Sequence, residues 1–259
     1  MLAGLNFGSA GKEHEDELSD VDPVFIVRDE DYGEFDAELP AIFSRFRLPI
    51  LLWWPESCNS DDFRNYAIFL RGDEVLQYDI NIMKASLLDK DVGQWTLAQC
   101  EPEHILFDKT GLLSAAFQRR VIPKYSPDRL GWSIEQYWIY AFIHVKYLKR
   151  SSGFKLAYAQ DMLFRSHLEV LRALYPQVFW SWWPDVAQKL LRPEHQDALM
   201  LYFGSKDAVA VGEALPLQMD CFARDAKAAC LAHGLSYPEE FEAAVRSHFH
   251  RHFCPTDDK

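Results

Sequence analysis

The sequence predicts an α+β protein in which a mixed-sheet α/β domain over residues 1–124 precedes an all-helical bundle domain over residues 125–259. Three observations support this. Apolar runs of strand length alternate with turn residues in the first half, and apolar residues recur at helical spacing in the second. Pro123 and Pro127 stand between the two patterns, which places the boundary near residues 121–131. A chain of 259 residues suits two domains of ordinary size.

The first half contains five segments with strand character. They are Leu2–Phe7, Val21–Val27, Leu48–Trp54, Tyr66–Leu70 and Val75–Met83. A helix is predicted over 33–46, and the turn Arg71-Gly72-Asp73-Glu74 makes the last two strands a β-hairpin. A further apolar piece, His104–Phe107, ends at a turn signature. We therefore expect about five strands and one clear helix in this half.

The second half follows the period of an α-helix throughout. Ser133 followed by Gln136 has the spacing of a capping box, and the apolar stripe that follows runs to Leu148. Further helices are predicted at 156–174, 185–191, 194–203, 207–232 and 238–252. Pro216 is expected to interrupt the fourth of these, because proline lacks a backbone donor and clashes inside a helix.

Composition excludes several classes of protein. Hydrophobic residues at 49% and charged residues at 25% are typical of a globular protein, and no apolar run reaches the ~20 residues that span a bilayer. The N-terminus lacks the pattern of a secretory signal, so we expect a cytoplasmic protein that does not bind membranes. The five cysteines include no C-x-x-C pair, which favours reduced thiols over disulfides or a structural zinc site.

Negative charge is concentrated in the first half. Residues 1–124 carry a net charge of -11 and residues 125–259 a net charge of -1. Nucleic-acid affinity comes largely from Lys and Arg that displace counterions, so this surface disfavours a nucleic-acid partner. A small cationic molecule would instead be attracted to it.

One short motif joins small residues to paired carboxylates. Gly8 and Ser9 are separated by ten residues from Asp20-Val21-Asp22, which enters a predicted strand. Residues two apart on a strand face the same side, so Asp20 and Asp22 are expected to present their carboxylates to one point. Such oxygen ligands suit Mg²⁺, and the Gly-Ser turn allows backbone N–H groups to approach a triphosphate.

A third carboxylate is expected from the hairpin. In the strand 75–82 the alternation places Leu76, Tyr78, Ile80 and Ile82 on an apolar face and Gln77, Asp79 and Asn81 on a polar face. Three convergent carboxylates can hold two metal ions ~3.5–4 Å apart, which stabilise both the attacking and the leaving oxygen of an in-line displacement. Asp20, Asp22 and Asp79 are therefore the candidate catalytic and metal-binding residues.

These residues carry a family resemblance. Gly8-Ser9, the ten-residue gap, Asp20-Val21-Asp22 and the later Asp79 resemble the signature of the DNA polymerase beta-like nucleotidyltransferase superfamily. The α/β half followed by a helical half resembles, within it, the bacterial aminoglycoside and lincosamide antibiotic nucleotidyltransferases. The resemblance implies that Asp20 and Asp22 bind metal, that Gly8 and Ser9 contact the triphosphate, and that Asp79 is a metal ligand or the base. It also implies ATP as donor and a small antibiotic as acceptor.

Other candidates rest on position alone. Lys12 is a candidate for contacting a phosphate and is equally explained as a solvated loop lysine. Glu135 begins the helix nearest the domain junction, where it is a candidate for binding the acceptor. The basic group Lys146, Lys149 and Arg150 is equally explained by the preference of a helix C-terminus for cations. His248 and His252 share a helical face but do not make a metal site by themselves. Two alternatives to an antibiotic acceptor stay open: a protein hydroxyl, and a regulatory module that binds nucleotide without turnover.

Overall fold

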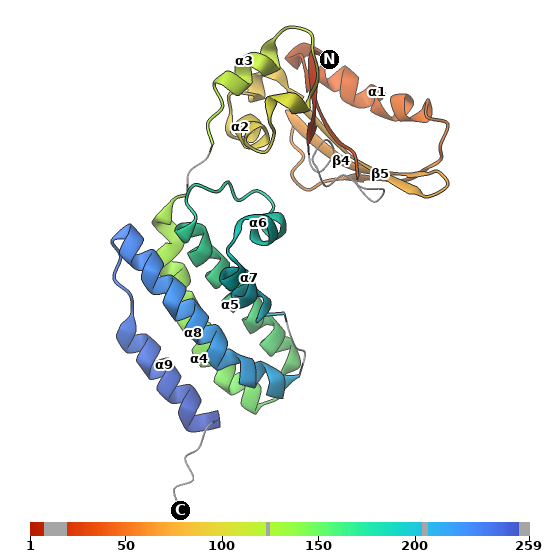
Figure 1. Cartoon of the computed structure of the whole chain (residues 1–259). Helices are drawn as coiled ribbons and strands as arrows, with labels where there is room; N and C mark the ends of the chain where they lie inside the picture. The colour runs from red at the N-terminus through yellow and green to blue at the C-terminus, as the bar shows by residue number, and fades with distance from the viewer. Residues whose placement is uncertain (8–19, 123–124, 204–206, 254–259) are drawn as a thin grey trace, which may run out of the picture. The chain divides into compact units, whose positions relative to one another are not determined.

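The computed structural model describes residues 1–7, 20–122, 125–203 and 207–253. The chain divides into two compact units, Met1–Pro123 and Lys124–Lys259. In its described part the first unit is a mixed β-sheet with helices on both faces, and the second is built from helices (Figure 1). The α+β fold class predicted from the sequence is confirmed.

The sheet has six strands within the described residues. They are β1 (Ala3–Phe7), β2 (Asp22–Val27), β3 (Ile50–Pro55), β4 (Phe63–Arg71), β5 (Val75–Lys84) and β6 (Ile105–Asp108). Their order across the sheet is β3-β4-β5-β2-β1-β6. The β2 and β5 strands pair in parallel, and the other neighbours pair antiparallel. The predicted hairpin is β4–β5.

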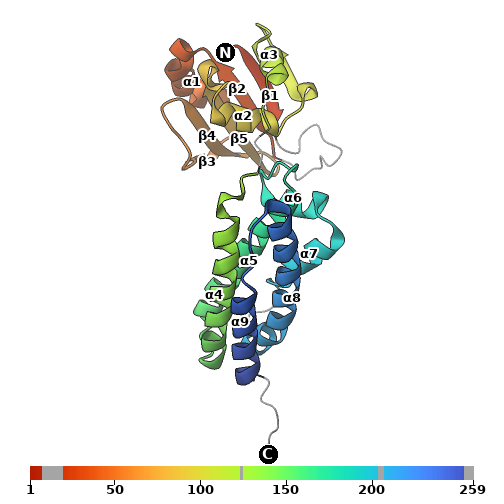
Figure 2. The same ribbon diagram turned by 90° about the vertical axis from the view of Figure 1, so that its left-hand side faces the viewer.

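Helices cover the two faces of the sheet unequally. The helix α1 (Tyr32–Ser44) buries Leu39 and Phe43 against one face. On the other face α2 (Asp91–Ala98) and α3 (Leu112–Gln118) pack over the strands that carry Leu5 and Val24 (Figure 2).

The helices α2 and α3 and the sixth strand correct the expectation of one helix and about five strands. The two helices have eight and seven residues, which is too short for a helical period to stand out in the sequence. A Cβ on Gly93 would lie 2.2 Å from the carbonyl oxygen of Leu87, so the packing of α2 against the preceding turn requires glycine.

The second unit is a helical bundle. Its helices are α4 (Leu130–Lys149), α5 (Gly153–Leu174), α6 (Trp183–Leu190), α7 (Pro193–Met200), α8 (Ala208–His233) and α9 (Glu239–Phe253). Its core combines aliphatic and aromatic side chains: Tyr137 stacks on Phe222 at a centroid distance of 3.5 Å, and Trp138 is fully buried beside them. None of the helices in the described residues is long and apolar enough to cross a membrane.

The start of α4 differs from the prediction. Ser133 lies inside the helix and is buried, so it does not cap the helix N-terminus and the capping-box interpretation is wrong. The chain enters α4 through a 3₁₀ turn, Pro127–Arg129, in which the Ser126 side chain accepts a hydrogen bond from the backbone N–H of Asp128. Ser126 supplies the cap and Pro127 is a favoured first residue of such a turn. This Ser-Pro signal precedes the Ser133–Gln136 pair in the sequence.

Pro216 does not interrupt its helix. The helix α8 is continuous from Ala208 to His233 with Pro216 inside it. Leu215 and Met219, one on either side of the proline, are almost completely buried in the bundle core. Tertiary packing therefore outweighs the loss of one backbone hydrogen bond.

We expect Pro216→Ala to stabilise the protein by on the order of 1 kcal/mol or more, because alanine restores the missing backbone donor and removes the ring clash. The measurement is urea unfolding of the full chain. Leu217→Ala, which truncates an adjacent side chain that is 53% exposed, is the control and should change the unfolding free energy by less than about 0.5 kcal/mol. A lower midpoint for Pro216→Ala would contradict this account of α8.

A buried histidine is held neutral in the bundle. The Nδ1 atom of His144 lies 3.1 Å from the carbonyl oxygen of Tyr140 and therefore donates to it, so Nε2 accepts from the Gln160 amide at 3.2 Å. Gln160 is fixed in turn by Gln218, whose Nε2 donates to the Gln160 Oε1 at 3.2 Å. Burial lowers the pKa of His144 to about 4, and the hydrogen bond to the Tyr140 carbonyl opposes this shift.

His144 should make folding sensitive to mild acid. Its folded pKa lies below the unfolded value of about 6.5, so the unfolded state binds the proton first and stability falls as the pH drops from about 6.5 towards 4. The expected loss from this residue is on the order of 2–3 kcal/mol across that window. Urea unfolding at pH 7, 6 and 5 measures it, and His144→Gln should have a flatter pH dependence than the wild-type chain. Parallel pH profiles would contradict the neutral assignment.

Candidate metal centre

The structure brings together the three carboxylates that the sequence singles out. One oxygen from each of Asp20, Asp22 and Asp79 lies within 4.8 Å of the others. The strand register explains this meeting. Val21 pairs with Tyr78 and Val24 pairs with Asn81 in the same parallel register, so Asp22 lies directly beside Asp79 on one face of the sheet.

Pro23 lies between these paired residues, on an inner strand. In the register of Val21 and Val24 it lies opposite Ile80, and having no N–H it cannot donate to β5 there. The carbonyl oxygen of Asp79 instead accepts a hydrogen bond from the Asn81 side chain at 3.3 Å. Proline therefore does not displace Asp22, which keeps its place beside Asp79.

The environment of Asp79 favours a positive partner. Burial raises the pKa of Asp79, the hydrogen bond from Gln77 opposes the rise, and the negative charges of Asp20 and Glu56 add to it. Its Oδ2 accepts that bond from Gln77 Nε2 at 3.1 Å, whereas its Oδ1 is buried without a hydrogen-bond partner among the described residues. A buried carboxylate oxygen without a partner is costly, and a cation at this point would offset the cost.

Amide side chains line the same face beside the carboxylates. Asn65 on β4 donates to Asn81 on β5 at 2.7 Å, which fixes both amides next to Asp79. The predicted polar face of β5, formed by Gln77, Asp79 and Asn81, is confirmed, and Ile80 and Ile82 are buried on the opposite face. The three carboxylates thus lie on a polar part of the sheet.

The remaining candidates do not join this cluster in the described structure. Gly8, Ser9 and Lys12 lie outside the described residues. Glu135 is exposed on α4, in the second unit.

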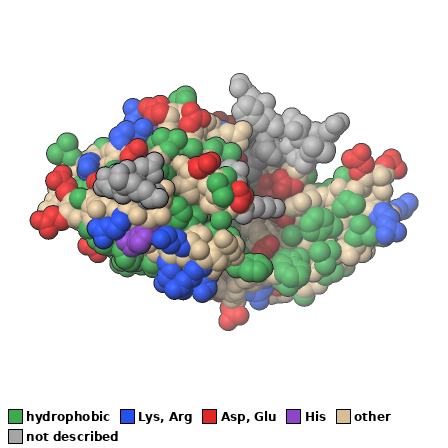
Figure 3. All heavy atoms as spheres, turned by 90° about the horizontal axis from the view of Figure 1, so that it is seen from below, with side chains coloured by type: hydrophobic (Ala, Val, Ile, Leu, Met, Phe, Trp, Pro, Cys, Tyr) green, Lys and Arg blue, Asp and Glu red, His purple; other side chains and the backbone are tan. Residues whose placement is uncertain are grey.

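The basic and histidine groups meet at one end of the bundle, where Figure 3 shows Lys and Arg side chains beside a histidine. There Lys149 Nζ lies 3.0 Å from His252 Nδ1, and the ring of His248 stacks on Phe142 at 4.4 Å. These contacts are those of a packed surface joining α4 to α9. Among the described residues, the three aspartates are the only group of three or more His, Cys, Asp or Glu side chains arranged to hold a metal ion.

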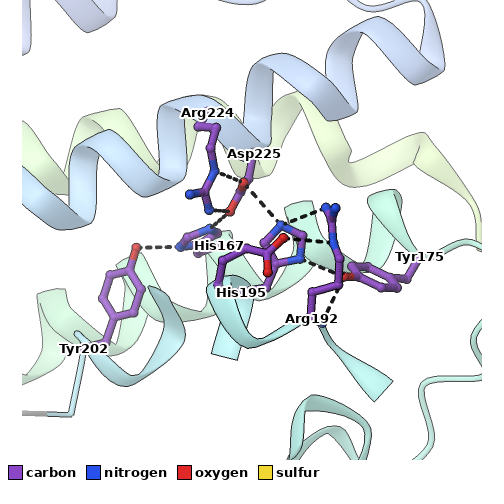
Figure 4. Close-up of polar contacts among 8 residues, drawn as sticks. His167, Tyr175, Arg192, His195, Tyr202, Arg224 and Asp225 are labelled. Atoms are coloured by element: carbon purple, nitrogen blue, oxygen red, sulfur yellow. Dashed lines mark hydrogen bonds and ion pairs between the residues drawn. The ribbon is translucent and has the colours of Figure 1, made fainter. Parts of the chain in front are cut away.

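Sequence reasoning missed a buried polar network in the second unit (Figure 4). Asp225 accepts a hydrogen bond from His167 Nε2 at 2.9 Å and one from Arg224 Nε at 2.7 Å, and its other neighbour is His195 Nε2 at 3.5 Å. The Nδ1 atom of His195 is hydrogen-bonded to the Tyr175 hydroxyl at 2.8 Å.

His167 lies on α5, Tyr175 directly follows that helix, His195 lies on α7, and Arg224 and Asp225 lie on α8. Because these residues come from separate helices, no spacing in the sequence predicts that they meet. The bonds from the two histidines and Arg224 hold the pKa of Asp225 far below its usual value, against the effect of burial. The carboxylate is therefore ionised inside the bundle.

Comparisons with known proteins find similarity among solved structures alone. No family model matches the sequence, and no curated protein matches it. Among solved structures, an aminoglycoside 6-adenyltransferase from Bacillus subtilis aligns with 98% of this chain and 92% of its own, with a TM-score of 0.47 and 12% sequence identity. The identity is too low to assign a role to any residue.

Proposed function

We propose that this chain is a metal-dependent nucleotidyltransferase that moves a nucleoside monophosphate from a nucleoside triphosphate to a hydroxyl of a small acceptor. The observation that carries the proposal is the meeting of Asp20, Asp22 and Asp79 within 4.8 Å on one sheet face. The order of Gly8-Ser9 and Asp20-Val21-Asp22 along the chain, which resembles the nucleotidyltransferase signature, supports it further.

The residues suit a divalent cation. Three carboxylates provide the hard oxygen ligands that Mg²⁺ prefers, and the buried Oδ1 of Asp79 has no other partner among the described residues. Asp20, Asp22 and Asp79 would hold Mg²⁺, and two ions are accommodated by three carboxylates of this kind. When bound, the metal supplies positive charge that stabilises the phosphoryl oxygens in the transition state.

The chain's own residues position the reactants. Gly8 and Ser9 would contact the triphosphate through backbone N–H groups, with Lys12 near the phosphates. An acceptor oxygen attacks the α-phosphorus, the bond to the β-phosphate oxygen breaks, and pyrophosphate leaves. The proton of the acceptor hydroxyl passes to Asp79 or to water. Positioning and charge would provide most of the rate, as in other phosphoryl transfers.

The proposed acceptor is small and cationic, such as an aminoglycoside or a lincosamide, with ATP as donor. The net charge of -11 on residues 1–124 supports a cation and disfavours nucleic acid. The helical unit would contribute to the acceptor site, with Glu135 as the candidate residue.

A panel of aminoglycosides and lincosamides assayed with ATP and Mg²⁺ for pyrophosphate release tests the proposal. We expect release with at least one member of the panel and none without metal. Label transferred from ATP only to protein in a lysate would replace the small acceptor by a protein hydroxyl. Nucleotide binding without pyrophosphate release under any acceptor would overturn catalysis in favour of a regulatory module.

A further inference from the structure

The edge strand β3 extends the face that carries the carboxylates. Trp54 pairs with Ala67 on β4, and Ala67 pairs with Asp79 on β5. Paired residues of neighbouring strands project to the same side, so Asp22, Asp79, Ala67 and Trp54 form one row across four strands. Strands lie ~4.8 Å apart, which places Trp54 about 10 Å from Asp79 along the sheet, with only a methyl group between them.

Trp54 is exposed, whereas the adjacent Trp53 is not. Trp53 points to the opposite face and packs on Phe43 and Tyr66 at centroid distances of 5.7 and 5.3 Å. Trp54 remains 53% exposed, and Leu52, on the same face, remains 46% exposed. Trp54 therefore contributes less to the core than Trp53 does, and its ring is available to a ligand.

The geometry of an in-line displacement places the acceptor on the side of the carboxylates that faces β4 and β3. The proposed triphosphate-binding residues follow Phe7, which pairs with Asp22 from the β1 side of the sheet. The leaving and attacking oxygens lie on opposite sides of the α-phosphorus. With pyrophosphate on the β1 side of the carboxylates, the attacking hydroxyl approaches from the side of β4 and β3, where Ala67 leaves room.

The charges on this side favour a cation. The backbone N–H of Glu56 donates to the carbonyl of Asn65 at 3.0 Å, which continues the β3–β4 pairing and places Glu56 on the face of Asn65. Nearby basic side chains are engaged on the opposite face: Arg64 pairs with Asp36 at 3.4 Å, and Lys84 pairs with Asp62. Arg71 lies at the hairpin end of β4. An aromatic face next to a carboxylate is a favourable environment for an ammonium or guanidinium group.

We propose that Trp54 and Glu56 form the subsite that binds a positively charged amine or guanidinium group of the acceptor, with the ring of Trp54 against the cation and Glu56 as its counter-ion. The inference rests on the proposed function and specifies its acceptor side. Both residues are specificity-determining and neither touches the reacting atoms. An acceptor held here presents its hydroxyl over Ala67 towards the carboxylates.

The test compares Trp54→Ala and Glu56→Gln with the wild-type chain, with kanamycin and streptomycin as cationic probes and lincomycin as the probe with fewer charges. We expect each variant to raise KM for the cationic probe at least tenfold, while KM for ATP changes less than twofold. Trp54→Phe keeps an aromatic face and should recover most of the affinity. Calorimetric titration of the same probes, in the presence of Mg²⁺ and a non-hydrolysable ATP analogue, gives a readout independent of turnover.

Matched controls separate this effect from general damage. Leu106→Ala removes an exposed side chain, 57% accessible, from β6 at the opposite edge of the sheet, and Glu74→Gln removes an exposed charge in the hairpin turn. Both should leave KM for the probes unchanged. A rise in KM for ATP alone in Trp54→Ala would overturn the inference and make Trp54 a platform for the nucleobase.

The two proposals fail in different ways. Turnover by the wild-type chain with unchanged probe KM and probe affinity in Trp54→Ala and Glu56→Gln would overturn the subsite and leave nucleotidyl transfer intact. If no acceptor yields pyrophosphate, the proposed function fails and the calorimetric titration decides the subsite. If neither kanamycin nor streptomycin then binds the wild-type chain, the subsite proposal is overturned as well.

Discussion

Replacing Asp22 by asparagine is expected to abolish metal-dependent pyrophosphate release, a loss of more than about 10³-fold in kcat, because it removes the charge of one of the three carboxylates proposed to bind the metal. Asp22 lies beside Asp79 through the strand register and is 8% exposed, so its carboxylate is held against that of Asp79. Asparagine has nearly the same shape, and the sheet should fold as before. Asp20→Asn should have an effect of the same kind, since its carboxylate belongs to the same cluster.

Steady-state pyrophosphate release measures the loss, and thermal unfolding with and without Mg²⁺ tests its cause. A metal that binds only the folded chain raises its stability, so Mg²⁺ should raise the Tm of the wild-type chain and not that of Asp22→Asn. Asp73→Asn, which alters an exposed carboxylate in the β4–β5 turn, serves as the control and should respond to Mg²⁺ like the wild-type chain. Full activity in Asp22→Asn would refute the site assignment.

The carboxylate cluster was accessible to sequence reasoning because it rests on two local rules. The two-residue period of a strand places Gln77, Asp79 and Asn81 on one face, and the same period relates Asp20 to Asp22. What the sequence does not state is that β2 and β5 are neighbours in parallel register, which is a long-range property of the sheet. The convergence of Asp79 with Asp20 and Asp22 was therefore only an expectation from the sequence, and the parallel pairing provides its geometric basis.

Other features could not be read from the sequence because tertiary packing decides them. Pro216 remains inside α8, since the burial of Leu215 and Met219 outweighs a local preference. Trp53 and Trp54 are adjacent and chemically identical, yet Trp53 packs against a core and Trp54 is exposed on the face that carries the three carboxylates. Which of two neighbouring tryptophans faces the carboxylates depends on the register of β3 with β4, including its irregularity between Ile50 and Leu52.

The buried network around Asp225 is a feature of the second unit that no sequence pattern predicts. His167 and Asp225 are 58 residues apart and both are almost completely buried, and their hydrogen bond joins α5 to α8. Arg224 is half exposed, so water screens its charge and it contributes less than its short distance to Asp225 suggests. The imidazole N–H groups inside the bundle therefore do most to satisfy the carboxylate.

Asp225→Asn should consequently destabilise the chain by about 3 kcal/mol, since removing one member of a buried charged network leaves its partners without compensation. Asp220→Asn, on the same helix, is the matched control. Its carboxylate is 64% exposed in an ion pair with Arg246, so the expected cost is below about 1 kcal/mol. Urea unfolding of the full chain measures both, and equal costs for the two variants would contradict the network's role.

The pH dependence of the same pair tests the cause of the loss. The folded-state pKa of Asp225 is depressed, so its contribution is present above the unfolded value of about 4 and is lost as the pH falls below it. The difference in unfolding free energy between the wild-type chain and Asp225→Asn should therefore be constant from pH 7 to 5 and shrink below pH 4. A gap that persists undiminished in acid would mean that the variant acts through packing, because a purely steric effect does not depend on the ionisation of the carboxylate.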